Sequence, residues 1–456
     1  MSEPLVVSRA TTIGTSAEAL WAWHASPGAF ERLRPPWERV AIVARSAPGL
    51  VEGLRVTLRV RRGPISVQWT ARHDGVRPGE GFVDVQEHGP FTSWRHEHRF
   101  VAGVGNTQLE DTIAVRPPFG ALGMLVAGPL LRRMLTRMLR YRHDITRHDL
   151  EQQMTTPLAP MRIAITGASG MVGSALVPFL TAQGHTAVPV SRRPAPGGIQ
   201  WDPASGTLDA AAFEGLDAVI HLAGENIAGE RWTDSRKAAL RESRVGPTAL
   251  LARTLASLQR PPKVLISASA VGIYGDQGDA ALSESARPAD DFLGRLGAAW
   301  EAAAEPARQA GIRVVHPRFG IILTPEGGAL AKMLPTARAG ISGPLGSGDQ
   351  WMSWIALDDV LGALHHLLAH SEVSGPVNTV TPSPVRNRDF ATTLGAVLGR
   401  PAVLPVPAFA LKLLFGEMAE ATLLASTRVV PTVLESSGYQ FRYPTLEAAL
   451  RHLLGR

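Results

Sequence analysis

The sequence predicts an α/β protein built from two unlike parts. Residues 1–155 read as an α+β unit, and 161–382 read as a doubly wound parallel sheet that a helical segment, 383–456, follows. Three observations support this. The first part shows strand-like runs at short spacing and then one long amphipathic helix. A polar, proline-bearing stretch, 151–160, reads as a linker, and alternating strand and helix signals begin at Met161. At 456 residues the chain is also longer than one ordinary domain.

The composition describes a foldable globular chain, because 45% of the residues are hydrophobic and 19% are charged. There is no cysteine, which excludes disulfides, thiolate zinc sites and cysteine nucleophiles. The N-terminus MSEPLVVSRATT lacks a signal-peptide pattern. We therefore expect a cytoplasmic protein. The longest apolar run, Phe119–Leu131, is too short to span a bilayer.

The net charge of +6 does not indicate a nucleic-acid partner. No cluster of basic residues is interleaved with aromatic ones, as a nucleic-acid surface would require. We expect a small-molecule substrate, and neither nucleic acid nor a membrane span.

The elements of the first part follow in a clear order. Leu5–Ile13 is strand-like, Ser16 can cap a short helix, and a second short helix is expected at Pro27–Leu33. Phe119–Leu150 closes the part as a helix with one apolar stripe. Between them lie six strand-like runs: Arg39–Arg45, Leu54–Val60, Ile65–His73, Gly81–Glu87, Thr92–Val101 and Thr107–Val115.

This order of elements resembles the START/polyketide-cyclase-like (SRPBCC) superfamily with the helix-grip fold. The resemblance covers residues 1–155 and rests on topology. It implies a curved antiparallel sheet around the last helix and a cavity for an apolar, lipid-like or aromatic ligand; a filled core without a ligand is the alternative. Trp69, Trp94, His96 and His98 are candidate cavity residues. The two histidines share one strand face, but they fit a solvent-facing position equally well, and two histidines alone do not make a metal site. We therefore predict no metal.

The second part alternates strands with helices, which predicts a parallel sheet. The longest helical runs are Asp234–Leu258 and Asp291–Ala310. The strand-like runs are Arg162–Thr166, Ala187–Val190, Ala218–Leu222, Lys263–Ala268 and Arg313–Arg318.

A glycine turn, ITGASGMVG, joins the first of these strands to a helix. Gly167 allows a tight turn, Gly170 leaves room for a pyrophosphate at the backbone, and Gly173 allows close packing of helix and sheet. The helix N-terminus offers N–H groups and a positive dipole end to phosphate. The predicted cofactor-binding residues of this turn are Gly167, Ser169, Gly170, Met171, Val172 and Gly173.

The second strand ends at Ser191, followed by Arg192 and Arg193. An NAD site usually has an acidic residue here for the ribose hydroxyls, whereas an arginine can pair with a 2′-phosphate. The sequence therefore predicts NADP(H) rather than NAD(H), unless these arginines are simply surface charges.

Two further strand ends belong to the predicted site. The third strand ends in the small residues Ala223 and Gly224, which let a cofactor cross its carboxyl edge, and Leu222 before them is also a predicted cofactor-binding residue. The stretch KVLISASAVGIYG places Ser267 and Ser269 at the end of the next strand. His221, by contrast, is expected to be structural.

Together these stretches resemble the epimerase-like branch of the extended short-chain dehydrogenase/reductases, and more narrowly the atypical YfcH-like epimerase family. The matching stretches span nearly all of 161–456: ITGASGMVG, AGENIAGERWT, SASAVGIYG, LGRLGAAWE, GGALAKMLP, GPLGSGDQWMSWIALDDV and SPVRNRDF. The resemblance implies a Rossmann domain, bound NADP(H) and a C-terminal helical segment typical of the family.

The catalytic set departs from the superfamily pattern. Ser269 matches the catalytic serine, but Phe292 and Leu296 stand where a Tyr-x-x-x-Lys pair would supply and tune a proton. Tyr274 and Lys237 are the remaining catalytic candidates; the alternatives are a packed tyrosine and a solvated helix lysine.

The favoured function is therefore NADP-dependent oxidoreductase or epimerase-like chemistry on a small molecule, with an apolar ligand in the first part. The missing pair supports an alternative, a non-catalytic NADP(H) sensor or partner-binding protein. Relatives are sometimes labelled cell-division inhibitors, and nothing in these residues supports or excludes that role. A lipid carrier that uses only the first part is a third reading.

Overall fold

The computed structural model of the protein describes residues 3–47, 49–228 and 230–456. The described chain forms two compact units. The first consists mainly of residues 3–157, and the second mainly of Leu158–Val177 and His185–Leu454.

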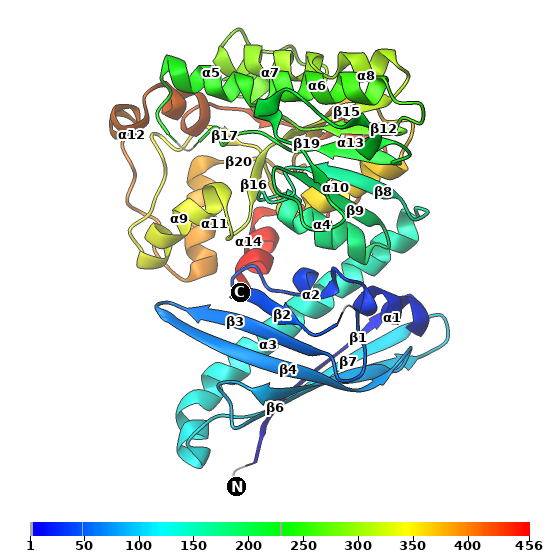
Figure 1. Ribbon diagram of the computed structural model, residues 1–456. Coiled ribbons are helices and arrows are strands. Elements are labelled where there is room, and N and C mark those ends of the chain that lie inside the picture. Colours follow the sequence, from blue (N-terminus) through cyan, green and yellow to red (C-terminus); the bar gives the residue numbers. More distant parts are fainter. Residues whose placement is uncertain (1–2, 48, 229) are drawn as a thin grey trace. The chain divides into compact units, whose positions relative to one another are not determined.

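The first unit is a seven-stranded antiparallel sheet in the order β1-β7-β6-β5-β4-β3-β2 with a long helix along one of its faces (Figure 1). Its strands are β1 (Leu5–Ile13), β2 (Arg39–Arg45), β3 (Arg55–Arg62), β4 (Ile65–Arg77), β5 (Gly81–His88), β6 (Ser93–Ala102) and β7 (Thr107–Arg116). Its helices are α1 (Ala17–Ala25), α2 (Ala29–Arg32) and α3 (Gly120–Thr155).

Local sequence explains these elements. Ser16 caps α1, because its side chain accepts a hydrogen bond from the Ala19 N–H at 3.2 Å. Along β7 buried and half-buried residues alternate, so that Leu109, Ile113 and Val115 share the buried face. The apolar stripe of α3 is buried as predicted, and includes Leu135. The predicted order of strand, two short helices, six-strand meander and long helix is confirmed.

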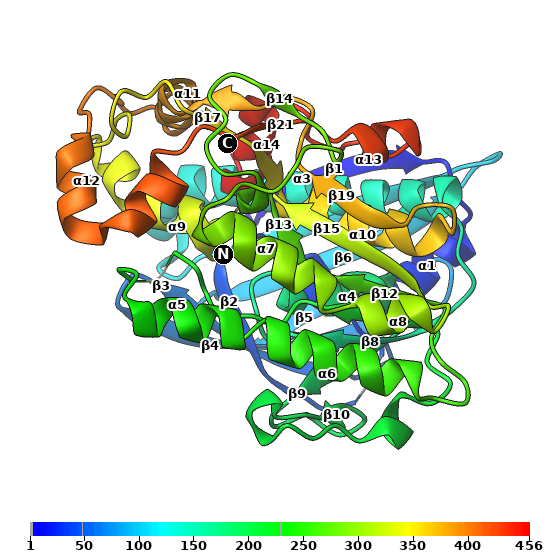
Figure 2. The same cartoon turned by 90° about the horizontal axis from the view of Figure 1, so that it is seen from above.

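The second unit is built on a parallel sheet in the order β10-β9-β8-β11-β12-β15, with β19 paired to the far side of β15. Figure 1 shows helices α5 to α8 on one side of this sheet and α4 and α10 on the other, and Figure 2 gives the view from above. The strands are β8 (Arg162–Thr166), β9 (Thr186–Ser191), β10 (Ile199–Gln200), β11 (Ala218–His221), β12 (Val264–Ser267), β13 (Ser269–Ala270), β15 (Arg313–Phe319) and β19 (Gly375–Thr379). The predicted doubly wound parallel sheet is confirmed.

Two predicted helices are wrong in extent. Instead of one helix over Asp234–Leu258 there are two, α5 (Asp234–Glu242) and α6 (Val245–Ala256), which separate at Ser243 and Arg244. The predicted helix Asp291–Ala310 is likewise α7 (Phe292–Ala302) and α8 (Glu305–Gln309). In the first case the buried Arg244 side chain binds the carbonyls of Leu240 and Glu225, so a tertiary contact overrides the local helix preference.

The remaining helices are α4 (Gly173–Ala182), α9 (Gly328–Ala339), α10 (Leu357–Ala369), α11 (Asn387–Leu398), α12 (Ala408–Phe415), α13 (Thr432–Ser436) and α14 (Leu446–Leu454). Short strand pairs accompany them: β14 (Ala281–Leu282) with β21 (Arg428–Val429), β16 (Ile321–Leu323) with β18 (Trp354–Ala356), and β17 (Trp351–Met352) with β20 (Val385–Arg386). Helices α9, α11 and α14 share one hydrophobic core with β16 to β18. Among the helices in the described part of the chain, none has the length and apolar character needed to cross a bilayer.

Candidate functional site

The glycine turn lies where the strand order of the parallel sheet reverses, between β8 and β11. In open α/β sheets this switch point is where ligands bind. Gly167 has a left-handed backbone with φ of 68°, and a Cβ there would stand 2.9 Å from the Leu222 carbonyl. A Cβ on Gly173 would stand 2.2 Å from the Gly167 carbonyl oxygen. Both contacts are too short, so the turn requires glycine at each position.

Gly170 is the exposed one among the three glycines of the turn. Its N–H donates to the Gly167 carbonyl at 2.9 Å, and an added Cβ would lie 3.1 Å from that same oxygen. Ser169 is exposed, and Met171 and Val172 are half-buried. Helix α4 begins at Gly173, so its first N–H groups and its positive dipole end face the turn. The backbone therefore fits a pyrophosphate.

The end of β11 is fixed by a buried threonine and a buried histidine. The Thr166 hydroxyl accepts the N–H groups of Leu222 and Ala223, each at 3.2 Å. His221 is fully buried and joins Thr166 Oγ1 at 2.7 Å to Thr248 Oγ1 at 3.0 Å. His221 is thus structural, as expected, and its burial lowers its pKa to about 4.

We expect acid to destabilise the second unit through His221. Because its folded pKa lies below the ordinary value of 6.5, its stabilising effect is complete above about pH 6.5 and is lost as the pH falls toward about 4. The loss is on the order of 2–3 kcal/mol. Thermal unfolding of the full chain between these pH values should depend less steeply on pH in His221→Gln than in the wild type. Equal slopes for the two proteins would contradict this role.

Arg244 is a functional candidate that the sequence did not reveal. Its guanidinium donates to the Glu225 carbonyl at 2.6 Å and lies 5.0 Å from the centroid of the Trp300 ring. Burial lowers its pKa to about 10. It also lies at contact distance from the Cβ position of Gly224, so it supports the exposed segment after β11. A lone arginine in a helical stretch carries no sequence signal for this role.

Arg192 and Arg193 follow directly on β9 and are exposed. Since β9 pairs with β8 in the parallel sheet, both arginines follow the strand next to the one that leads into the glycine turn. Ser191, the last residue of β9, is half-buried and pairs with Gln200. The charge therefore stands at the carboxyl edge, where a 2′-phosphate would need it.

Ser269 belongs to a buried polar network that centres on Arg318. The Ser269 hydroxyl donates to Glu301 at 2.7 Å, and Glu301 accepts two further bonds of 2.7 Å from Arg318. Arg318 also donates to the Tyr274 hydroxyl at 2.8 Å, which in turn donates to Asn378 at 2.7 Å. Burial alone would raise the pKa of Glu301, but the bonds from Arg318 and Ser269 outweigh it and lower that pKa.

The contacts of this network distinguish the roles of the serine and tyrosine residues predicted for the site. Tyr274 is fully buried with both partners of its hydroxyl inside the core, and burial raises its pKa; we place it among the structural residues. Ser267 is also fully buried within the sheet. Ser269, at 2% exposure, has its hydroxyl held by Glu301. Glu301 and Arg318 were not among the predicted site residues. The only signal in the sequence was that Arg318 is a charged residue inside the strand RVVHPRF.

Phe292 and Leu296, which occupy the positions of the missing pair, lie in an apolar cluster. Trp232 packs edge-on against Phe292 with ring centroids 5.1 Å apart, and Leu296 is buried beside Met418. Lys237 lies 5.3 Å above the Phe292 ring, but its ammonium pairs with Glu417 at 2.5 Å. These contacts support the alternative interpretation of Lys237, a helix lysine at the surface, here in an ion pair with Glu417.

The first unit encloses a cavity of about 430 Å³, so its core is not filled. Its walls are mainly apolar, and the T-shaped pair Trp69 and Trp94 forms part of them, with ring centroids 4.8 Å apart. One region of the lining is polar instead, and includes His24, His73, Asp84, His96, His98 and Arg142. His96 and His98 are 2% and 4% exposed, so they face the cavity and not solvent.

Comparison with known proteins identifies three family regions. Residues 13–141 match the family described as polyketide cyclase / dehydrase and lipid transport. Residues 163–380 match the NAD dependent epimerase/dehydratase family, and 406–453 match a domain of unknown function.

Curated relatives match the second unit. An epimerase family protein of Mycobacterium bovis is 42% identical over 297 residues, which cover 64% of this chain and 98% of the relative. The human epimerase family protein SDR39U1 is 38% identical over 64% of this chain and 100% of its own length. A crystal structure of isoform 2 of that human protein contains NADPH. It superposes on this chain with a TM-score of 0.60 at 37% identity, and the match covers 64% of this chain and 99% of that one. The predicted cofactor agrees with this relative.

A solved structure that covers nearly the whole chain matches both units. A nucleoside-diphosphate sugar epimerase from Corynebacterium glutamicum is 34% identical, with a TM-score of 0.82 over 98% of this chain and 90% of that one. The predicted combination of an epimerase-like part with a polyketide-cyclase-like part is therefore confirmed. With 42% identity to a relative that it covers over 98% of its length, the chain belongs to the epimerase family of atypical short-chain dehydrogenase/reductases, and it carries a polyketide-cyclase-like unit at its N-terminal end.

Proposed function

We propose that the second unit binds NADP(H) and carries out hydride-transfer chemistry, as an oxidoreductase or epimerase, on a small molecule. The observation that carries this proposal is the glycine turn at the switch point of the parallel sheet, with two exposed arginines after the neighbouring strand. The NADPH in the human relative's structure supports it.

Different residues of the chain would bind different parts of NADP(H). The backbone of Gly167–Gly173 would cradle the pyrophosphate, Arg192 and Arg193 would pair with the 2′-phosphate, and the segment Leu222–Gly224 would let the cofactor cross the carboxyl edge of β11. Ser269, held by Glu301 at 2.7 Å, is the hydroxyl closest in role to the superfamily's catalytic serine. Bound NADPH supplies the hydride. We also propose that the NADP(H)-binding domain spans residues 161–382 and that the helical segment after it spans 383–456.

A thermal-shift comparison of the full chain with NADPH and NADH tests the proposal. At about 100 times its dissociation constant a ligand adds roughly 2.7 kcal/mol of stability. We expect a clear rise of the unfolding temperature with NADPH and a smaller one with NADH at equal concentration. No rise with either cofactor would overturn the proposal.

We expect Arg192→Ala to weaken NADPH binding by about tenfold or more while NADH binding stays nearly constant, because only NADPH carries the 2′-phosphate. Titrations of the full chain with both cofactors measure the ratio. Arg253→Ala is the matched control, because Arg253 is an exposed arginine on α6 of the same unit. An equal loss for both cofactors would remove the argument from the arginines.

We further propose that the first unit holds an apolar ligand, which the cavity of about 430 Å³ and the lipid-transport family match support. The ligand would be a substrate or product of the second unit. Mass spectrometry of apolar molecules extracted from the purified full chain tests this. Replacing Ala71, which lines the cavity, by Trp should reduce the amount that co-purifies; the same yield from both proteins would contradict the proposal.

A second candidate function is a non-catalytic NADP(H) sensor or partner-binding protein. The specific observation in its favour is that Phe292 and Leu296 pack in an apolar cluster with Trp232, and neither of these two side chains can supply a proton. Oxidation of NADPH by the full chain against a library of carbonyl compounds separates the two functions. Turnover of any compound favours the enzyme, whereas NADPH binding without turnover favours the sensor.

A further inference from the structure

The polar side of the cavity in the first unit is a compact cluster on three neighbouring strands. Asp84 on β5 pairs in register with His96 on β6, and His98, two residues further along β6, pairs with Asp111 on β7. Because alternate residues of a strand share a face, His96 and His98 both point to the cavity side. Asp111 is 3% exposed.

The ligand-type atoms of Asp84, His96 and His98 all lie within 4.8 Å of one another. Asp84 Oδ2 is 3.5 Å from His98 Nε2 and 4.0 Å from His96 Nδ1. In a tetrahedral zinc site with bonds of about 2.0–2.1 Å, neighbouring ligand atoms stand about 3.3 Å apart. The three side chains therefore need to close by up to about 1.5 Å to hold one ion.

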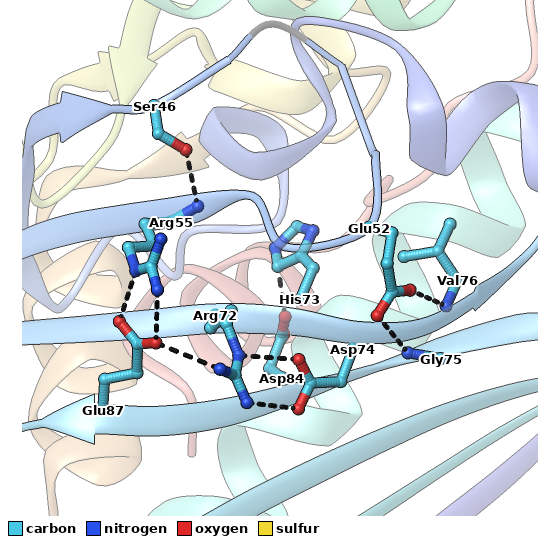
Figure 3. A network of polar contacts seen from close by, with 10 residues as sticks. All are labelled: Ser46, Glu52, Arg55, Arg72, His73, Asp74, Gly75, Val76, Asp84 and Glu87. Carbon is cyan, nitrogen blue, oxygen red and sulfur yellow. Dashed lines mark hydrogen bonds and ion pairs between the residues drawn. The ribbon is translucent and has the colours of Figure 1, made fainter.

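Two of the three proposed ligands also have a close partner behind them. His98 Nδ1, the nitrogen turned away from Asp84, lies 2.7 Å from Asp111 Oδ1. The other oxygen of Asp111 lies 3.2 Å from His143 Nε2. Asp84 Oδ1 lies 3.1 Å from His73 Nε2, a contact that Figure 3 shows. A carboxylate behind a ligating histidine is the outer-shell arrangement that orients the ring toward a metal.

Hydrogen bonding alone leaves this cluster poorly satisfied. Asp84 Oδ1, His96 Nε2 and His98 Nδ1 are buried, and within the described residues none makes a hydrogen bond of good geometry despite its charged neighbours. Asp84 and Asp111 bring two carboxylates to this cluster, and both attract a divalent ion held by Asp84, His96 and His98.

We propose that Asp84, His96 and His98 bind one divalent transition-metal ion, with Zn²⁺ as the best match for two imidazoles and one carboxylate. All three residues line the cavity, so the fourth coordination position opens into it. Three protein ligands with an open position are typical of zinc that binds a further ligand, not of a structural zinc. The site lies in the first unit and does not depend on NADP(H) binding by the second.

Titration of the chelator-treated full chain with Zn²⁺, followed by calorimetry, tests the site. Titration with Co²⁺ adds the visible absorption of a tetrahedral complex as a second readout. We expect one ion per chain in the wild type and at least about 100-fold weaker binding in Asp84→Asn and in His96→Gln, since each variant removes one of three ligands. Asp111→Asn should weaken binding about 10–100-fold, because it acts only through the histidines.

His88→Gln is the matched control, because it removes an exposed histidine from β5, the strand that carries Asp84. It should bind Zn²⁺ like the wild type. Circular dichroism establishes whether each variant is folded. If a buried substitution unfolds the protein, the stoichiometry of Zn²⁺ binding and the Co²⁺ spectrum of the wild type still test the proposed site. Absence of one-to-one binding to the wild type, or wild-type affinity in both folded ligand variants, would overturn the proposal.

Discussion

Gly173→Ala should abolish NADPH binding by the full chain, with an affinity loss of at least about 100-fold, or roughly 2.7 kcal/mol. The alanine Cβ would stand 2.2 Å from the Gly167 carbonyl oxygen and 2.7 Å from the Ala168 Cα. Both neighbours are backbone atoms, so the clash cannot be relieved by a side-chain rotation. The turn must open, and the N–H groups at the start of α4 then lose their alignment toward the phosphates. Isothermal titration with NADPH measures the loss.

The control is Gly246→Ala on α6, where an added Cβ meets nothing within 4 Å and the backbone needs no left-handed conformation. It should bind NADPH like the wild type. Gly170→Ala is the intermediate case, because its Cβ would lie 3.1 Å from the Gly167 carbonyl oxygen, so it should lose less affinity than Gly173→Ala. Undiminished binding in a folded Gly173→Ala protein would show that this turn does not hold the cofactor.

Arg318→Met should destabilise the second unit by about 3–5 kcal/mol, the effect of removing one partner from a buried ion pair. The arginine side chain is 6% exposed and that of Glu301 is 15% exposed. Without the guanidinium, the Glu301 carboxylate stays buried with only the Ser269 hydroxyl, and the Tyr274 hydroxyl loses its donor. Chemical denaturation of the full chain, followed by a probe specific to the second unit, measures the loss.

Two further variants separate the ion pair from other causes. Arg308→Met breaks an exposed pair with Glu305, so it should change stability by at most about 1 kcal/mol. The double variant Arg318→Met/Glu301→Gln removes the stranded charge and should recover part of the loss. If the double variant were no more stable than Arg318→Met, the buried carboxylate would not be the source of the cost.

Strand positions could be predicted well because they depend on local alternation and on turn residues. The first strand, Leu5–Ile13, and the strand before the glycine turn, Arg162–Thr166, agree residue for residue with the structure. The helix breaks at Ser243 and at Ala303 could not be predicted, since the residues there are acceptable in a helix. At Ser243–Arg244 the break accompanies contacts of Arg244 with residues that precede α5, which no local pattern records.

The glycine turn could be recognised because its whole chemistry lies in a few consecutive residues. The Ser269–Glu301–Arg318 network could not, because its members come from β13, α7 and β15, and only the folded sheet brings them together. The same holds for the histidines of β6. Their alternation was visible, but the partners Asp84 and Asp111 come from neighbouring strands whose register the sequence did not give.

The pairing of β1 with β7 constrains how the first unit is made. Leu5 pairs with Val115, at the other end of the meander, whereas β2 to β7 pair in sequence with their neighbours. During synthesis the successive hairpins can therefore form as they leave the ribosome, but the first strand waits until β7 has emerged. Until then its apolar residues, among them Leu5, Val7 and Ile13, have no sheet to join. A nascent chain halted before Thr107 would thus be a substrate for chaperones, whatever the stability of the finished protein.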